Sequence, residues 1–400
     1  MLEGLDAIDW SAVEHAYGPA TDVPDLLRTV ATGDAKQRKA ALDAFDASVN
    51  HQGWITPAAV PATPFLLELW RAEIEPARLT VLLADLAVGG FHGNYVVAGA
   101  PVESVPPEAR PMRDAIAGAH GDFVIALSHK DAKVRAAAAV ALGMLVERRD
   151  AGQAALRARL DIERKQEPLA CAVLALALLD LPEPAASDVA RIKTLAGHTS
   201  AVVQLAARIA LAQLSATRDD ALAALAAARE RPDREKNVPW NDGRLVDLAE
   251  RVAVDAIRRA GDMGALGDLV SAIGLIRVAP HALDLLFGAY RGPASRPREP
   301  LAMCELAPPA ATFVRLAADA IEAMRRENNA FFDPTLFTNR GLHDIVRLAG
   351  LRPRRPLDGR PDGTPGELPW RVARMVRDGR APREAWTACL RELPIAERED

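Results

Sequence analysis

Aromatic residues are scarce in this chain of 400 residues. Phe, Trp and Tyr make up 4% of the sequence, although 50% of the residues are hydrophobic. The apolar content is therefore carried mainly by Ala, Leu and Val. Strands draw on aromatic and β-branched side chains, whereas Ala and Leu are strong helix formers. The composition argues against an all-β fold and predicts an all-α protein.

Cysteines are equally few. Cys171, Cys304 and Cys389 lie far apart and form no CxxC pair, and an odd number suits a reducing compartment. The opening residues MLEGLDAIDW lack the basic and apolar segments of a signal peptide. The longest apolar run, Leu169–Leu179, is too short to span a bilayer and predicts a buried helix. We therefore expect a soluble, cytoplasmic protein without membrane association.

Signatures of common catalytic sites are also missing. None of the eight histidines is followed by glutamate, and HExxH, GxSxG and the Walker phosphate loop are absent. The glycines of Gly261–Gly267 have the wrong spacing for a dinucleotide-binding loop. No acidic or cysteine ligand is patterned with His129 and His198, which favours turn positions over a metal site. We expect no enzymatic activity, metal or cofactor.

The clearest pattern that is present runs from Leu127 to Leu145, LSHKDAKVRAAAAVALGML. Asp131 stands where an N-cap carboxylate accepts from the first free amides of a helix. Apolar residues then recur at helical spacing from Val134 onward. One such helix cannot bury its own apolar face, so further copies are expected.

Copies of this pattern occur on both sides of it. Asp34–Arg38 matches Asp131–Arg135 at four of five positions, and Gly197–Val203 parallels Ser128–Val134. A weaker copy at Glu167–Cys171 gives intervals of 36 and 33 residues, which are typical of helical-pair repeats. The motif resembles the second helix of a HEAT repeat. This resemblance implies a right-handed α-solenoid of stacked antiparallel helix pairs, and an arginine at position 135 that reaches an acidic group in the adjacent repeat. The residues in structural repeat positions are Asp34, Arg38, Asp131, Val134, Arg135, Ser200 (an N-cap in place of Asp131) and Val203.

The first half of the chain also resembles bacterial HEAT-repeat proteins that have no agreed activity. They share a Gly-Pro-Ala-Thr-Asp-x-Pro segment, as in Gly18–Pro24, and a His-Gln-Gly before an apolar helix, as in His51–Leu69. The resemblance implies an architecture and leaves the activity open.

Breaks in the repeat pattern suggest three parts. Residues 1–230 are expected to form HEAT-like repeats with an inserted loop at 89–107, and a polar seam at 231–243 separates them from a second helical half. Leu351–Pro369 contains five prolines, which excludes a regular element. The expected parts are 1–230, 231–350 and a Pro/Arg-rich segment with terminal helices, 351–400. The individual helices that we expect include 9–17, 22–32 and 108–128.

Polar and aromatic residues gather where the pattern breaks. They either converge on a pocket for a partner or ligand, or the tryptophans cover the apolar end of the first repeats while the histidines bind loop carbonyls. The second interpretation is favoured, because it needs no ligand. The candidate residues are His51, Trp54, Trp70, His92, Asn94 and Tyr95.

Charge is unevenly distributed over a chain with a net charge of −5 and a pI near 6, which argues against a general nucleic-acid binder. The segment 347–383 holds ten arginines and four acidic residues, among them the candidate binding residues Arg352, Arg354 and Arg355. A solvated or intramolecular role is favoured for this segment, followed by an acidic protein partner and then by nucleic acid.

We expect the chain to be a non-enzymatic scaffold that binds a protein partner on the concave face of a HEAT-like solenoid. Partner neutralisation or docking of an assembly are functions that suit this architecture, by family analogy alone. Two alternatives remain open. The first is a HEAT-fold enzyme of the DNA glycosylase or lyase type, and the second is a nucleic-acid accessory protein that acts through its Arg-rich C-terminus.

Overall fold

The computed structural model describes residues 1–51, 54–88, 109–181, 183–215, 217–230, 238–239 and 245–259. The chain divides into two compact units, Met1–Ala256 and Ile257–Asp400. The boundary expected after residue 230 lies at the edge of the described residues, and the boundary expected after residue 350 lies outside them. The elements are η1 (Leu5–Ala7), β1 (Glu14–His15), β2 (Gly18–Pro19), α1 (Val23–Thr32), α2 (Ala35–Val49), β3 (Asn50–His51), β4 (Trp54–Ile55), α3 (Ala59–Arg71), α4 (Pro76–Val88), α6 (Arg110–Gly118), α7 (His120–Ala126), α8 (Ala132–Met144), η4 (Val146–Arg148), α9 (Arg149–Ile162), α10 (Gln166–Asp180), α11 (Ala186–Leu195), α12 (Ala201–Ser215), α13 (Arg218–Arg229) and α14 (Leu245–Arg259).

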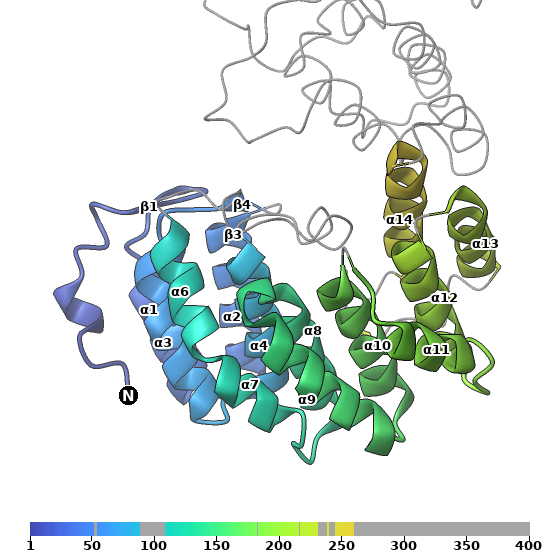
Figure 1. Ribbon diagram of the computed structural model, residues 1–400. Helices are drawn as coiled ribbons and strands as arrows, with labels where there is room; N and C mark the ends of the chain where they lie inside the picture. Colours follow the sequence, from blue (N-terminus) through green and yellow to red (C-terminus); the bar gives the residue numbers. More distant parts are fainter. Residues whose placement is uncertain are drawn as a thin grey trace, which may run out of the picture. The chain divides into compact units, whose positions relative to one another are not determined.

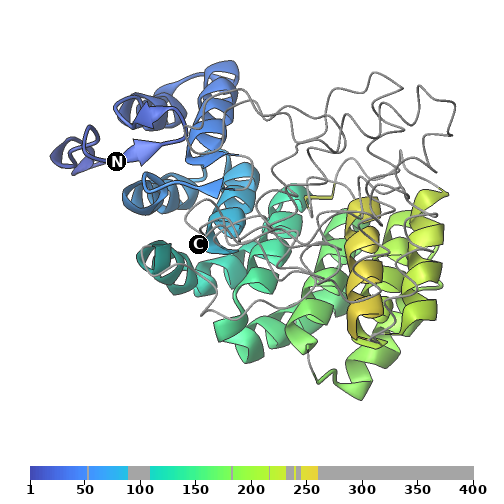
Figure 2. The same cartoon turned by 90° about the horizontal axis from the view of Figure 1, so that it is seen from above.

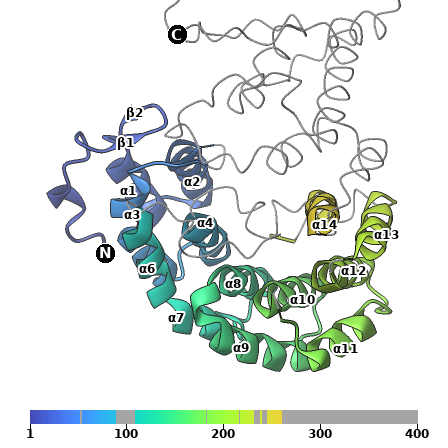
Figure 3. The ribbon, with the colours of Figure 1, turned by 45° about the horizontal axis from the view of Figure 1, so that its top comes forward.

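The described part of the chain is mainly helical, as the composition predicts, and consecutive helices pack against one another (Figure 1). Helix α8 contacts α4 on one side and α10 on the other, and α10 in turn contacts α12. Figure 3 shows α4, α8, α10 and α12 side by side in one row, with α7, α9 and α11 in a second row below them in this view. The same succession, from blue to green, can be followed from above in Figure 2.

The central position of α10 follows from its sequence. Every residue from Pro168 to Asp180 is buried, because Ala, Leu and Val surround the helix and leave no polar face toward solvent. Helix α8 is buried from Val134 to Met144 in the same way. Its alanines allow the helices on either side to approach closely. Among the helices of the described part, none is both long and apolar enough to cross a bilayer.

Two expected helices differ from the structure. Residues 9–17 do not form a helix, because Glu14–His15 pairs with Gly18–Pro19 in a two-residue antiparallel hairpin. Gly18 has a φ of 125°, a conformation that a side chain rarely permits, and the Ala16 amide donates to the Ser48 carbonyl of the neighbouring α2. The prediction of one long helix over 108–128 is also wrong, because the structure has two helices there, α6 and α7, separated next to Gly118.

Candidate functional site

Asp34 and Asp131 cap the N-termini of α2 and α8, as the sequence predicts. Asp34 accepts a hydrogen bond from the Gln37 amide at 2.9 Å, and the Gln37 side chain accepts one from the Asp34 amide at 2.8 Å. This reciprocal arrangement is a capping box, and it satisfies amides that a helix leaves without partners. Asp131 starts α8 by accepting from the Lys133 amide at 2.9 Å. Both side chains are committed to the helix ends that they cap.

Arg135 links α8 to the turn between α9 and α10. Its Nε donates to Oε2 of Glu163 at 2.8 Å, and a terminal nitrogen donates to the other carboxylate oxygen at 3.2 Å. The same guanidinium donates to the carbonyls of His129 and Lys130. Arg135 therefore bonds both to the turn before its own helix and to a buried acid 28 residues away.

Glu163 is the electrostatic centre of this cluster. Burial raises the pKa of its carboxyl, but hydrogen bonds from Arg135, the Lys165 amide, Arg159 and the Arg164 amide outweigh this effect and lower the pKa to about 2. Its side chain is 2% exposed. The cluster is therefore a buried, fully hydrogen-bonded tie between helices.

The other repeat positions contribute to packing and to a shared turn. Val134 and Val203 are buried at equivalent places in α8 and α12. The Ser200 hydroxyl, next to the start of α12, donates to the Gln166 side chain of α10 at 2.8 Å. His129 and His198 each accept, through Nδ1, from the amide two residues later, at 3.0 and 2.9 Å. Both histidines occupy turns, the position that their spacing favours.

Arg38 does not reproduce the role of Arg135. Its Nε is buried without a hydrogen-bond partner among the described residues. The sequence match at Asp34–Arg38 thus extends to the helix cap but does not extend to the buried ion pair.

The residues of the expected polar-aromatic pocket fall into three groups. Trp70 is buried, 6% exposed, and its ring lies 4.6 Å from that of Phe123, so it belongs to the core between α3 and α7. The backbones of His51 and Trp54 face each other in the β3–β4 ladder. Outside the described residues lie His92, Asn94, Tyr95, Arg352, Arg354 and Arg355.

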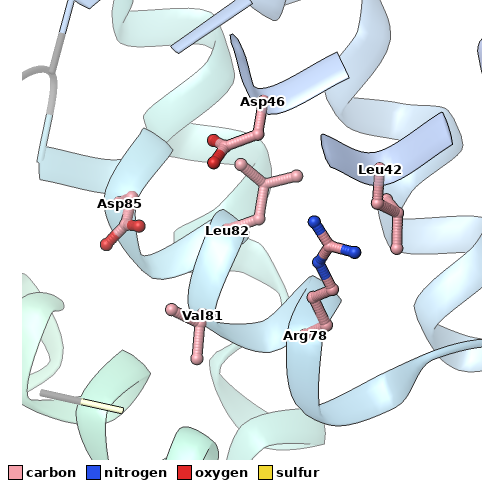
Figure 4. A pocket seen from close by; sticks show the side chains of 6 residues that line it. All are labelled: Leu42, Asp46, Arg78, Val81, Leu82 and Asp85. Carbon is pink, nitrogen blue, oxygen red and sulfur yellow. The ribbon is translucent and has the colours of Figure 1, made fainter. Parts of the chain in front are cut away.

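A groove that sequence analysis did not predict lies between α2 and α4 (Figure 4). Its volume is about 230 Å³. Spacing of three or four residues brings one face of each helix to the groove, and Figure 4 shows Leu82 between Asp46, Asp85 and Arg78. It is lined by Leu42 and Asp46 from α2 and by Arg78, Val81, Leu82 and Asp85 from α4.

The groove is lined by one basic and two acidic side chains, and the basic one, Arg78, is bound to α2. Arg78 donates to the Lys39 carbonyl at 3.0 Å and forms an ion pair with Asp43, so it connects α4 to α2. Hydrogen bonds from Lys39 and from Arg78 lower the pKa of Asp43. The other charged lining residues are the carboxylates of Asp46 and Asp85, and both have partners within the chain; Asp46 accepts from the Asn50 side chain at 3.2 Å. The groove thus combines apolar lining residues with two acidic groups on opposite helices.

The spacing of these lining residues is visible in the sequence, but it is the spacing of any helix face. Which faces of α2 and α4 remain accessible depends on the distance between the two helices. Comparison of the sequence with protein-family models and with curated proteins gives no match.

Proposed function

We propose that the chain is a HEAT-like α-solenoid that acts as a non-enzymatic protein-binding scaffold. The succession of α8, α10 and α12 supports the repeat architecture: these helices begin at Ala132, Gln166 and Ala201, and each contacts the next. The matching histidine turns before α8 and α12 support it as well. In such an array, binding energy comes from side chains spread over neighbouring helices.

The groove between α2 and α4 carries the functional part of the proposal. A volume of about 230 Å³ accommodates a large side chain, whereas one water molecule occupies about 30 Å³. Val81 and Leu82 offer apolar contact to the stem of a partner's Lys or Arg side chain. An ionised carboxylate has about four acceptor sites, so Asp46 and Asp85 can bind its charged end in addition to the partners that they already have within the chain. We therefore propose that the groove binds a basic side chain of a partner protein.

The enzyme alternative receives no support from Trp70, since this ring is buried in the core against Phe123. The nucleic-acid alternative concerns the Arg-rich segment, which lies outside the described residues. Neither alternative is favoured by a specific observation, and the scaffold function remains our proposal.

Charge reversal in the groove tests this proposal. Full-length protein is used to capture partners from native lysate, and bound proteins are quantified by mass spectrometry for the unaltered chain and for Asp85→Lys. The matched control is Asp114→Lys, which makes the same charge change at an exposed position on α6. We expect a protein retained by the unaltered chain and the control to be lost with Asp85→Lys. Equal retention by all three proteins, or no retained protein, would contradict the proposal.

A further inference from the structure

Two carboxylates are buried together where α9, α10 and α11 meet. Asp180 is the last residue of α10, and Asp188 lies in the first turn of α11. Their side chains are 1% and 3% exposed. Arg157 of α9 lies between them, with a terminal nitrogen 2.6 Å from Oδ2 of Asp188 and 3.6 Å from Oδ1 of Asp180. One guanidinium thus serves two buried carboxylates.

The hydrogen bonds around Asp180 are incomplete. Oδ1 accepts from the Gln153 side chain of α9 at 2.7 Å, and the same amide group donates to the Leu179 carbonyl at 3.1 Å. Oδ2 is buried and has no hydrogen-bond partner in the described part of the chain. A buried carboxylate oxygen without a donor is costly. A proton bound at this oxygen would turn it into a donor for a neighbouring acceptor.

Among the described residues, the other charged groups near the junction do not supply a second cation. Asp150 of α9 adds negative charge near Arg157. Arg191 of α11 donates to Asp161 and to the Arg157 carbonyl. Glu183, in the connection between α10 and α11, is exposed. With both aspartates ionised, the buried cluster therefore carries one more negative charge than positive charge.

We propose that Asp180 and Asp188 share one proton in the folded protein, and that loss of this proton loosens α11 from α9 and α10. The carboxyl of Asp180 then donates to the Asp188 carboxylate, while Arg157 neutralises the charge that remains. This arrangement makes the α10–α11 junction a pH-sensitive joint in the helix array. It does not depend on the function proposed above.

The direction of the pH effect follows from the cluster's electrostatics. Burial, and after it the charge of Asp188, raise the pKa of Asp180 from 3.8 to about 6. A raised pKa means that the folded state holds its proton at a pH where the unfolded state has lost it. The stabilisation is complete below about pH 4 and disappears as the pH rises through about 6.

His120 opposes this trend. Burial lowers its pKa from 6.5, so its contribution to stability increases as the pH rises through this region. The effect of Asp180 therefore has to be isolated by comparison with a variant in which His120 is unchanged.

Hydrogen exchange of the α11 amides in the full-length chain, corrected for the intrinsic effect of pH, provides this comparison. In Asp180→Asn the side-chain amide donates to Asp188 at every pH. We expect protection of α11 to fall by up to about 30-fold between pH 4.5 and 7.5 in the unaltered chain, a limit set by the displacement of the Asp180 pKa. Protection should change far less in Asp180→Asn. The control Glu183→Gln, in the same connection, should behave like the unaltered chain.

Equal pH dependence of protection in the unaltered chain and in Asp180→Asn would overturn the proposal. Should Asp180→Asn fail to fold, titration of ¹³C-labelled aspartate carboxyls in the unaltered protein decides the matter. A carboxyl that titrates near pH 6 supports the shared proton. An unaltered protein in which every aspartate titrates below about pH 4.5 contradicts it.

Discussion

Replacement of Glu163 by Gln removes the charge at the centre of the α8–α10 tie while keeping the size of the side chain. The carboxylate accepts from Arg135 and Arg159 and from the backbone amides of Arg164 and Lys165. Its pKa is lowered from 4.5 to about 2, and each pKa unit corresponds to about 1.4 kcal/mol. The charged form therefore contributes about 3 kcal/mol of stability at neutral pH. The loss of one partner from a buried ion pair costs a similar amount.

Equilibrium unfolding of the full-length chain in urea at pH 7 measures this loss, and we expect Glu163→Gln to be less stable by about 3 kcal/mol. The difference should shrink below about pH 4.5, because a lowered pKa gives stability that is lost as the folded carboxyl becomes protonated. Asp161→Asn is the matched control, since its exposed pair with Arg191 is worth about 0–1 kcal/mol. A Glu163→Gln protein as stable as the control would refute the role assigned to this cluster.

Three further predictions concern the core and a helix cap. Trp70→Ala should lower the free energy of unfolding by about 3–5 kcal/mol, because it empties the space against Phe123; a loss below about 1 kcal/mol in thermal or urea unfolding would count against this packing. Burial raises the pKa of the Cys171 thiol, so peptide mapping after iodoacetamide treatment should find Cys171 modified only in unfolded protein. Asp131→Ala should cost about 1 kcal/mol and Asp131→Asn much less in the same unfolding assay, whereas equal losses would show that the cap does not matter.

The sequence predicted the helical class and the helix starts best, because these depend on local chemistry. An N-cap such as Asp34 or Asp131 acts within three residues of the helix that it begins. The apolar surface of Leu169–Leu179 predicted a buried helix, and this segment lies within α10, whose residues from Pro168 to Asp180 are buried. The resemblance of Leu127–Leu145 to a HEAT-repeat helix implied that Arg135 reaches an acidic group, but it did not identify Glu163.

Features that depend on contacts between residues far apart in the chain could not be predicted from the sequence. The hairpin at Glu14–Pro19 is held by a bond from Ala16 to Ser48, more than thirty residues away. The groove, lined by Leu42 and Leu82, depends on the distance between α2 and α4, and periodicity alone does not reveal how far apart two helices lie. The Asp180–Asp188 pair likewise requires that the end of one helix meet the start of the next.

Partner binding in the groove can be tested by site-specific photo-crosslinking. A photoreactive residue at Val81, in the groove lining, is compared in cells with one at Ile125, which is 73% exposed on α7 in the other row of helices. We expect the residue at position 81 to form a crosslinked protein adduct that the residue at position 125 does not form. Adding Asp85→Lys should abolish this adduct. No adduct from position 81, or the same adducts from both positions, would contradict it.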